Sequence, residues 1–360
     1  MKTLFLISTI TLLISCQKTI SQETTEQIKK NETFWKNRNI MITKNEIDRE
    51  YPIKKDAVIS DKRSNAIYIH SSGVQFEVLI DDVLLYNFKG EASMHQGGAM
   101  GLHEINPLML SSGIHEVKVR IYPEYGKKVF GEGGSMLLTF QYYPYNNLKE
   151  VTYNLSANGS SGISLDQESE YWKDEEGDYR LGTYIKGHYE PKEPLKLKGL
   201  PMYEWRSTFE AEVPFDLIGW RNSINLKKEN QETKSLQKEL LLEYKNIYEI
   251  IKNKEIDKFL GIIKEREAIV SQTLYYGTKE NKLRDEEFVK LLQNNDYEIE
   301  PIFEESLHMD FQGYGKLVTF LHKADKEGVI RLKNKKNPDE VIYLDFLFQR
   351  KLKNGKLSII

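Results

Sequence analysis

The chain has 360 residues, of which 51 are Lys or Arg and 54 are Asp or Glu, so its formal net charge at pH 7 is −3. The charges are mixed along the chain without a basic block, which excludes the usual signature of a nucleic-acid-binding protein. Hydrophobic residues make up 39% of the chain, enough for a globular body, and the length predicts two domains. No segment beyond the N-terminus is long and apolar enough to predict a transmembrane helix.

The N-terminus has the organisation of a signal peptide. Lys2 precedes an apolar run at residues 4–14, which is shorter than a helix needs to cross a bilayer. Residues 13–16 have the sequence LISC, which resembles the lipobox of bacterial lipoproteins. The resemblance implies that residues 1–15 are removed and that Cys16 becomes acylated, with palmitate among its acyl chains. Several acyl chains would attach the protein stably to a membrane.

Two other interpretations of this segment stay open: a secretory signal in which Cys16 is incidental, and a cytosolic protein with an apolar start. Cys16 is the only cysteine, and its position favours the lipoprotein. The remaining chain has no thiol for a disulfide, a zinc-thiolate site or a nucleophile. Gln17 stands where the family's inner-membrane retention signal has Asp, so the resemblance implies the cell outer membrane, with the side open. The polar residues 16–39 predict a tether.

Residues 40–225 predict a β-sandwich domain. Its clearest part begins with Phe76, Val78 and Ile80, which alternate with less apolar residues as expected for a strand with one buried face. Asp81-Asp82 then provides the turn of a hairpin. Similar runs recur between turn residues, at residues 40–42, 66–70, 74–80, 83–88, 115–122, 135–142, 150–155, 180–189 and 205–213. This spacing is typical of an antiparallel sandwich.

One further strand, at residues 115–122, predicts which face is buried. Its apolar residues are expected in the core and its charged residues in water; the two sets are Val117, Val119 and Ile121, and Glu116, Lys118 and Arg120. The loop and strand around residues 105–115 resemble immunoglobulin-like or jelly-roll carbohydrate-binding sandwiches. Such folds carry many functions, so this resemblance implies no particular one.

Residues 227–360 predict an α+β domain in which helices precede a sheet. Apolar residues at helical spacing form one face of a helix: Leu236, Leu240, Tyr244, Ile247 and Ile251. Helices at 256–270 and 285–293 follow, and then strands at 304–311, 316–322, 329–332, 341–348 and 356–360, with a hairpin turn at Asn354-Gly355. This order resembles the nuclear-transport-factor-like cone fold, which implies a curved antiparallel sheet around a long helix and a pocket between them. The predicted fold class is therefore α+β with two domains.

Aromatic residues give the best candidate for a ligand-binding surface. They form two clusters, Tyr171, Trp172 and Tyr179 beside an acidic run, and Tyr143 and Tyr145 with Tyr142 before them. Flat rings with polar edges suit a sugar face or a protein partner. Packing within the sheets explains the same residues and is the more common case. These residues are still the best binding candidates of the first domain, and the predicted partner is a protein or a glycan.

Metal sites are weaker candidates. Asp174, Glu176 and Asp178 alternate around a glycine and offer oxygen ligands for Ca²⁺, although the pattern is not a complete EF-hand and a solvated acidic loop is favoured. Three further residues, His95, His103 and Glu104, could ligate zinc but lack the histidine spacing of known sites, so solvated loop residues are again favoured. No cofactor is predicted.

Catalytic signals are also weak. Glu304, His308 and Asp310 share a face of a predicted strand and could provide a general base if that face lines the cone pocket, but a surface face is favoured. The chain lacks GxSxG, HExxH and phosphate-loop motifs. We expect a membrane-anchored envelope lipoprotein that binds a protein or a glycan without catalysis. Alternatives are an immunity protein against a toxin, a polysaccharide or peptidoglycan hydrolase, and an assembly protein.

The lipid anchor is directly testable. In a bacterial host fed labelled palmitate, we expect the wild-type chain to incorporate label and to sediment with membranes, whereas Cys16→Ser should lose nearly all label and membrane association. Ser21→Ala, in the tether, should behave as wild type. Mass spectrometry of the N-terminal peptide checks the modification, and an unmodified wild-type Cys16 would contradict the prediction.

Overall fold

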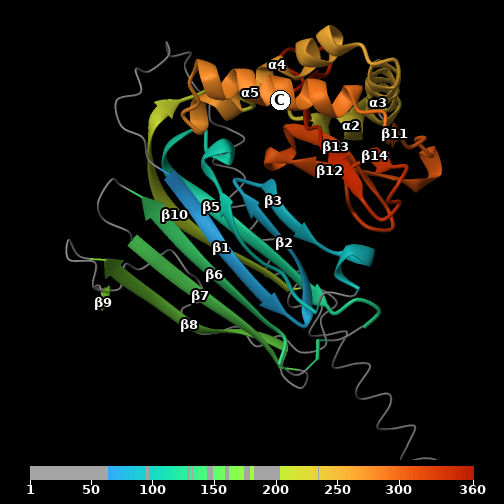
Figure 1. Cartoon of the computed structure of the whole chain (residues 1–360). Coiled ribbons are helices and arrows are strands. Elements are labelled where there is room, and N and C mark those ends of the chain that lie inside the picture. The colour runs from blue at the N-terminus through green and yellow to red at the C-terminus, as the bar shows by residue number, and fades with distance from the viewer. Residues whose placement is uncertain are drawn as a thin grey trace, which may run out of the picture.

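The computed structural model describes residues 64–94, 97–127, 130–131, 133–143, 149–158, 162–173, 179–181, 203–233 and 235–360. They form an α+β fold with a sheet-rich N-terminal domain and a C-terminal domain in which helices precede a curled sheet (Figure 1). The predicted fold class is therefore confirmed. The predicted signal peptide, the tether and the strand at 40–42 lie outside the described residues.

The N-terminal domain is built from two antiparallel sheets. Six strands pair in the order β4-β1-β6-β7-β8-β9, and four pair in the order β10-β5-β2-β3. The strands are β1 (Ser64–Ser72), β2 (Val74–Ile80), β3 (Val83–Phe88), β4 (Met100–Glu104), β5 (Ser111–Pro123), β6 (Ser135–Tyr143), β7 (Lys149–Asn158), β8 (Gly162–Lys173), β9 (Tyr179–Leu181) and β10 (Tyr203–Asp216). Short 3-10 helices η1 (Gly90–Ser93) and η2 (Asn106–Leu108) lie on either side of β4.

The two sheets bury the apolar residues that alternate along their strands. Residues of β1 and β6, such as Ile69 and Phe140, pack in one core with residues of β2 and β5, such as Phe76 and Val119. The predicted apolar faces of β2 and β5 are thus confirmed, and β2 and β3 have the predicted bounds. Because one face of each sheet is covered by the other sheet, the core explains why these sequences alternate.

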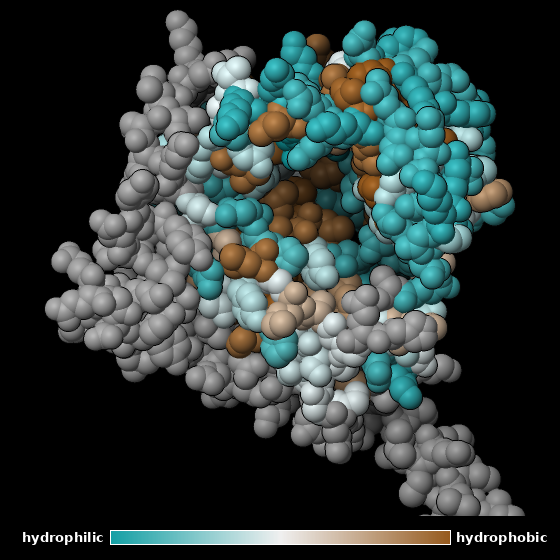
Figure 2. Space-filling view, viewed as in Figure 1, coloured by the Kyte–Doolittle hydropathy of each residue, from teal (hydrophilic) through white to brown (hydrophobic). Residues whose placement is uncertain are grey.

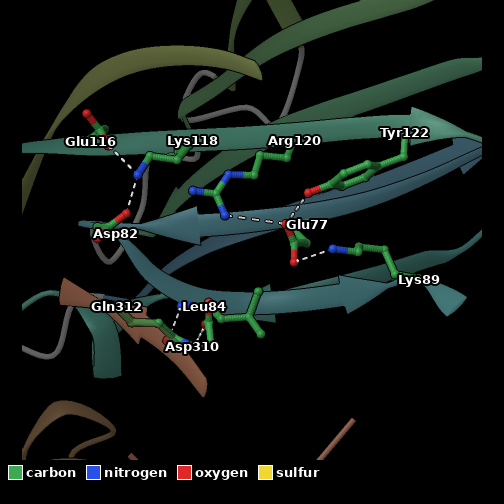
Figure 3. A network of polar contacts seen from close by, with 10 residues as sticks. All are labelled: Glu77, Asp82, Leu84, Lys89, Glu116, Lys118, Arg120, Tyr122, Asp310 and Gln312. Atoms are coloured by element: carbon green, nitrogen blue, oxygen red, sulfur yellow. Dashed lines mark hydrogen bonds and ion pairs between the residues drawn. The ribbon is translucent and has the colours of Figure 1, made fainter. Parts of the chain in front are cut away.

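The expectation that the charged face of β5 lies in water is wrong for two of its residues. Glu116 and Lys118 are 3% and 2% exposed. Lys118 Nζ forms an ion pair with Asp82 and lies 3.7 Å from Glu116 Oε1, so the buried charges compensate one another (Figure 3). A single strand's alternation shows which side is apolar but not what covers its polar side.

The same outer face carries a second compensated carboxylate. Glu77 Oε1 accepts a hydrogen bond from Lys89 Nζ at 2.9 Å, and Glu77 Oε2 accepts one from the Tyr122 hydroxyl at 2.8 Å and lies 3.6 Å from Arg120 Nη1. Burial alone would raise the pKa of Glu77, but the cations Lys89 and Arg120 hold it below its ordinary value. Arg120, unlike Glu116 and Lys118, stays partly exposed.

The C-terminal domain begins with helices α2 (Leu226–Thr233), α3 (Leu236–Lys252), α4 (Ile256–Thr273) and α5 (Thr278–Gln293). Its strands form two antiparallel groups, β11-β14-β15 and β12-β13-β16-β17. Their bounds are β11 (Tyr297–Ile299), β12 (Leu307–Gln312), β13 (Leu317–His322), β14 (Ile330–Asn334), β15 (Val341–Leu344), β16 (Phe348–Gln349) and β17 (Ser358–Ile359), with 3-10 helices η3 (Glu304–Ser306) and η4 (Gly313–Gly315). Asn354-Gly355 lies in the connection between the paired strands β16 and β17.

The predicted apolar face of α3 is the centre of this domain's core. All five of its residues are buried, among them Tyr244, whose hydroxyl lies 2.8 Å from Thr319 Oγ1. Sequence reasoning missed α2, β4, β8 and β11 and began α5 too late. The apolar positions of α5 are sparse, and its start is marked instead by the Glu280 carboxylate, which accepts the N–H of Gly277 at 2.9 Å.

The turn of the β2–β3 hairpin docks onto the C-terminal domain. Asp81 and Asp82 both have positive φ angles, 47° and 63°. Asp82 accepts backbone N–H groups through its carbonyl, from Gly313 at 2.8 Å, and through Oδ2, from Tyr314 at 2.7 Å. An apolar cluster joins the domains around this turn, namely Val83, Leu110, Trp220, Leu317 and Ile360. The hairpin thus connects the two domains by both polar and apolar contacts.

We expect Asp82→Ala to lower the free energy of unfolding by about 3 kcal/mol, because it leaves Lys118 buried without its nearest counter-charge and removes an acceptor from Tyr314. Asp82→Asn should cost roughly half as much, since Asn keeps the acceptor and tolerates the left-handed backbone. Chemical denaturation of the purified chain measures both. Glu124→Ala, at an exposed turn, is the control, and an equal effect there would contradict the prediction.

Candidate functional site

The predicted aromatic and calcium sites fall largely outside what the structure describes. Asp174, Glu176, Asp178 and Tyr145 lie outside the described residues. The backbones of the other aromatic candidates are placed in strands, with Trp172 opposite Arg180, Lys173 opposite Tyr179, and Tyr143 at the end of β6. Tyr171 pairs with Leu181. The side chains of these aromatic residues are not among those described, so both sites stay predictions.

His103 and Glu104 lie in β4, and His95 lies outside the described residues. The His103 ring stacks on Tyr86 with 4.5 Å between centroids, and burial lowers the pKa of His103. Glu104 Oε1 instead accepts a hydrogen bond from Ser64 Oγ at 2.6 Å. Neighbours in a strand point to opposite faces, so the two do not converge on one ion. In the described part of the chain, no group of three or more metal-binding side chains is arranged around a point.

The strand face that carries His308 and Asp310 contacts the sandwich through Gln312. Gln312, on the same face of β12, accepts the backbone N–H of Leu84 at 2.9 Å and donates to Asp310 Oδ2 at 3.0 Å, so the face meets the sandwich (Figure 3). Burial raises the pKa of Asp310. Glu304 lies in η3, before the strand, and pairs with Lys245 at 2.6 Å.

A different group of residues meets where β3 passes the turn between β13 and β14. Asn87 Nδ2 donates to the carbonyl of Lys326 at 3.1 Å. Just beyond β3, the backbone of Gly90 lies so close to this turn that a Cβ there would stand 2.5 Å from the carbonyl oxygen of Ala324. The turn therefore packs directly against the end of β3, and this position excludes any side chain larger than hydrogen.

This turn presents carboxyl groups at the domain boundary. Asp325 Oδ1 accepts the N–H of Glu327 at 3.0 Å and pairs with Arg331 Nη2 at 2.8 Å. Asp345, which directly follows β15, lies against Gly328, the residue after Glu327. A Cβ on Gly328 would stand 2.2 Å from Asp345 Oδ1. Tyr86 of β3 lies close enough for the charge of Glu327 to contribute to its raised pKa. We define the interdomain site as five residues: Tyr86, Asp325, Glu327, Arg331 and Asp345.

The three carboxyl groups of the interdomain site have different proton affinities. Burial and the charges of Asp345 and Asp325 raise the pKa of Glu327 to about 7. Burial also raises the pKa of Asp345, against the opposing effect of Arg266 and Arg331. Burial alone would raise the pKa of Asp325, but the hydrogen bonds from Arg331 and from the Glu327 N–H, together with the charges of Arg331 and His322, lower it. Near neutral pH, Glu327 can therefore give or take a proton beside an ionised Asp325.

The surface of the molecule has a hollow between the two domains (Figure 2). Figure 2 shows hydrophobic side chains at the base of this hollow and hydrophilic side chains around it. Asp345 is exposed to solvent although surrounding protein raises its pKa, as expected inside a concave surface. A groove of about 480 Å³ reaches Asp345, and its lining includes Arg266, Val270, Arg284, Phe288 and Tyr343.

Arginine and aromatic side chains alternate along this groove. The guanidinium of Arg331 lies 5.1 Å from the ring centroid of Tyr343, and those of Arg266 and Arg284 lie 5.6 and 5.5 Å from that of Phe288. Arg266 Nη1 also donates to the carbonyl of Asp345 at 3.1 Å. Planar cations held over rings are preorganised for polar, flat or anionic ligand groups. The arrangement therefore suits binding, and Glu327 adds a group for proton transfer.

Sequence reasoning missed the interdomain site. Its residues come from β3, the β13–β14 turn, β14 and β15, and the sequence around Glu327 (ADKEG) reads as an ordinary polar turn. The raised proton affinity of Glu327 arises from burial and from Asp345, which is distant in sequence. Only the order of the strands in the folded protein shows that these residues lie close together.

Comparisons with protein families, with curated proteins and with solved structures each found no match to this chain. Among the described helices, none combines the length and the apolar character that crossing a membrane requires.

We expect Glu327→Gln to stabilise the protein at pH 8 but hardly at pH 5. The pKa of Glu327 is raised on folding from 4.5 to about 7, so the folded state favours the protonated carboxyl, and wild-type stability falls as pH rises through this window. With allowance for partial exposure, the Tm gain at pH 8 should be about 2–4 °C. Thermal unfolding at both pH values measures it, and an equal gain at pH 5 and 8 would contradict this origin.

Proposed function

We propose that this protein is a lipid-anchored protein of the bacterial cell envelope that binds a glycan or protein partner in the groove of its C-terminal domain that reaches Asp345. The observation that carries the proposal is this groove. It combines arginine, aromatic and carboxyl side chains, among them Arg266, Tyr343 and Asp345. The anchor comes from the resemblance of residues 13–16 to a lipobox and stands as part of the proposal.

The geometry supports binding for two physical reasons. First, Arg266 is held by Glu267 and by the carbonyl of Asp345, so this part of the groove is positioned before a ligand arrives, which lowers the entropic cost of binding. Second, Tyr343 and Arg331 are stacked on each other at the groove. Concave sites with an apolar base and a few convergent polar groups are typical of ligand sites.

A second candidate, an envelope polysaccharide or peptidoglycan hydrolase, is favoured by one observation. Asp325 and Glu327 have pKa values shifted in opposite directions, which is the usual signature of an acid and an ionised carboxylate working together. In that case Glu327 would protonate the leaving oxygen of a glycosidic bond. Glu327→Gln would then abolish the release of fragments while leaving binding in place.

We expect soluble peptidoglycan or envelope-polysaccharide fragments to bind the purified chain, and Tyr343→Ala to weaken that binding about tenfold, because the ring supplies flat contact area at the groove. Tyr125→Ala is a matched control, since Tyr125 and Tyr343 are both 38% exposed but Tyr125 lies at an exposed turn of the sandwich. Titration calorimetry measures affinity, and chromatography of the same samples detects cleavage. Equal losses in both variants would argue against the groove.

A further inference from the structure

The two ends of β3 are held to the C-terminal domain by contacts that differ in charge balance. At the first end, the charge of Asp82 is compensated by Lys118 and by the backbone N–H of Tyr314. At the other end, the β13–β14 turn carries Glu327. Its carboxyl group makes no hydrogen bond or ion pair with any residue that the structure describes. The carboxylate of Asp82 is therefore charge-compensated, whereas the carboxyl group of Glu327 is not.

The groups around Glu327 are mostly committed to other partners. Arg331 pairs with Asp325 at 2.8 Å, and Arg266 pairs with Glu267 at 2.9 Å. The ionisable groups that face the turn come from the β13–β14 hairpin itself, β15, α4 and β3, and include His322, Asp345, Tyr343 and Tyr86. His103 of β4 lies behind them, against the ring of Tyr86. An ionised Glu327 therefore meets two aspartates, while the nearby arginines are already engaged.

We propose that the contact between the β13–β14 turn and β3 is a proton-dependent contact between the two domains, beside the groove that reaches Asp345. A protonated Glu327 lets the turn pack against Asn87 and Gly90, and an ionised Glu327 is repelled by Asp325 and Asp345 and draws the turn toward water. The Asp82 end of β3 does not depend on this proton and acts as the fixed end. The proposal assigns regulation to the proposed binding site and rests on that function for its biological meaning.

The size of the effect follows from linkage. The pKa of Glu327 is about 7 in the closed arrangement and 4.5 for a solvated Glu. Because opening releases the carboxyl to water, the equilibrium constant for opening should rise roughly tenfold between pH 6 and pH 8. This change is large enough for backbone hydrogen exchange to detect, since exchange reports the open fraction.

The test is hydrogen exchange of the full chain at pH 6 and pH 8, corrected for the intrinsic pH dependence of exchange and read by mass spectrometry without any ligand. Peptides covering residues 85–94 and 322–328 should lose protection about tenfold at pH 8. Glu327→Gln should keep them protected at both pH values. Glu298→Gln, on the exposed part of β11, should behave as wild type, and the peptide around Asp82 should not change.

Equal corrected protection of the wild type at both pH values would overturn the proposal, and so would a Glu327→Gln variant that still loses protection at pH 8. A loss shared by the Asp82 peptide would also overturn it, because that result would mean general loosening of the interface. Since no ligand is present, failure of the binding experiments would leave this measurement unaffected, and the two proposals can fail separately.

Discussion

The buried ion pair between Lys118 and Asp82 is the interaction on which the arrangement of the two domains depends. Lys118 comes from the middle of a sandwich strand. Asp82 comes from a hairpin turn, and its carbonyl and carboxylate accept N–H groups of Gly313 and Tyr314 in the C-terminal domain. A charge that is almost fully buried must keep its partner, so the turn is fixed to the sheet on one side and to η4 on the other. The left-handed backbone at Asp81 and Asp82 makes the turn narrow enough to fit there.

From this fixed point, β3 runs along the C-terminal domain to the interdomain site. The contrast between its two ends gives the site its character. Where charges are compensated, the interface is structural. Glu327 lacks a partner among the described residues, so its ionised carboxylate destabilises the folded state at neutral pH. Proteins tolerate such local costs mainly at functional sites, which is why this end, rather than the more heavily charged β5 network, is the better functional candidate.

The spacing of apolar residues predicted those strands and helices that bury one face in a core. Alternation defined β2 and β3, and helical spacing defined the buried face of α3, because in each case one face packs against a core. The burial of Lys118 could not be predicted, since it depends on Asp82 being brought opposite by the hairpin. The interdomain site could not be predicted either, because the pKa of Glu327 is raised by its burial in the fold and by the charge of Asp345, which is distant in sequence. One of the earlier site candidates, His103, lies next to this site, because its ring contacts Tyr86.

The hydrogen bond from Leu84 to Gln312 joins residues 228 positions apart, and β10 closes its sheet by pairing with the much earlier β5. Both contacts form only after long stretches of chain have been ordered, so the protein has a topology that favours slow folding. Until that point, Val83 and the open edge of β5 have no partners and are exposed to association with other chains. A chain exported unfolded would therefore depend on chaperone protection during the interval between leaving the translocon and docking its hairpin.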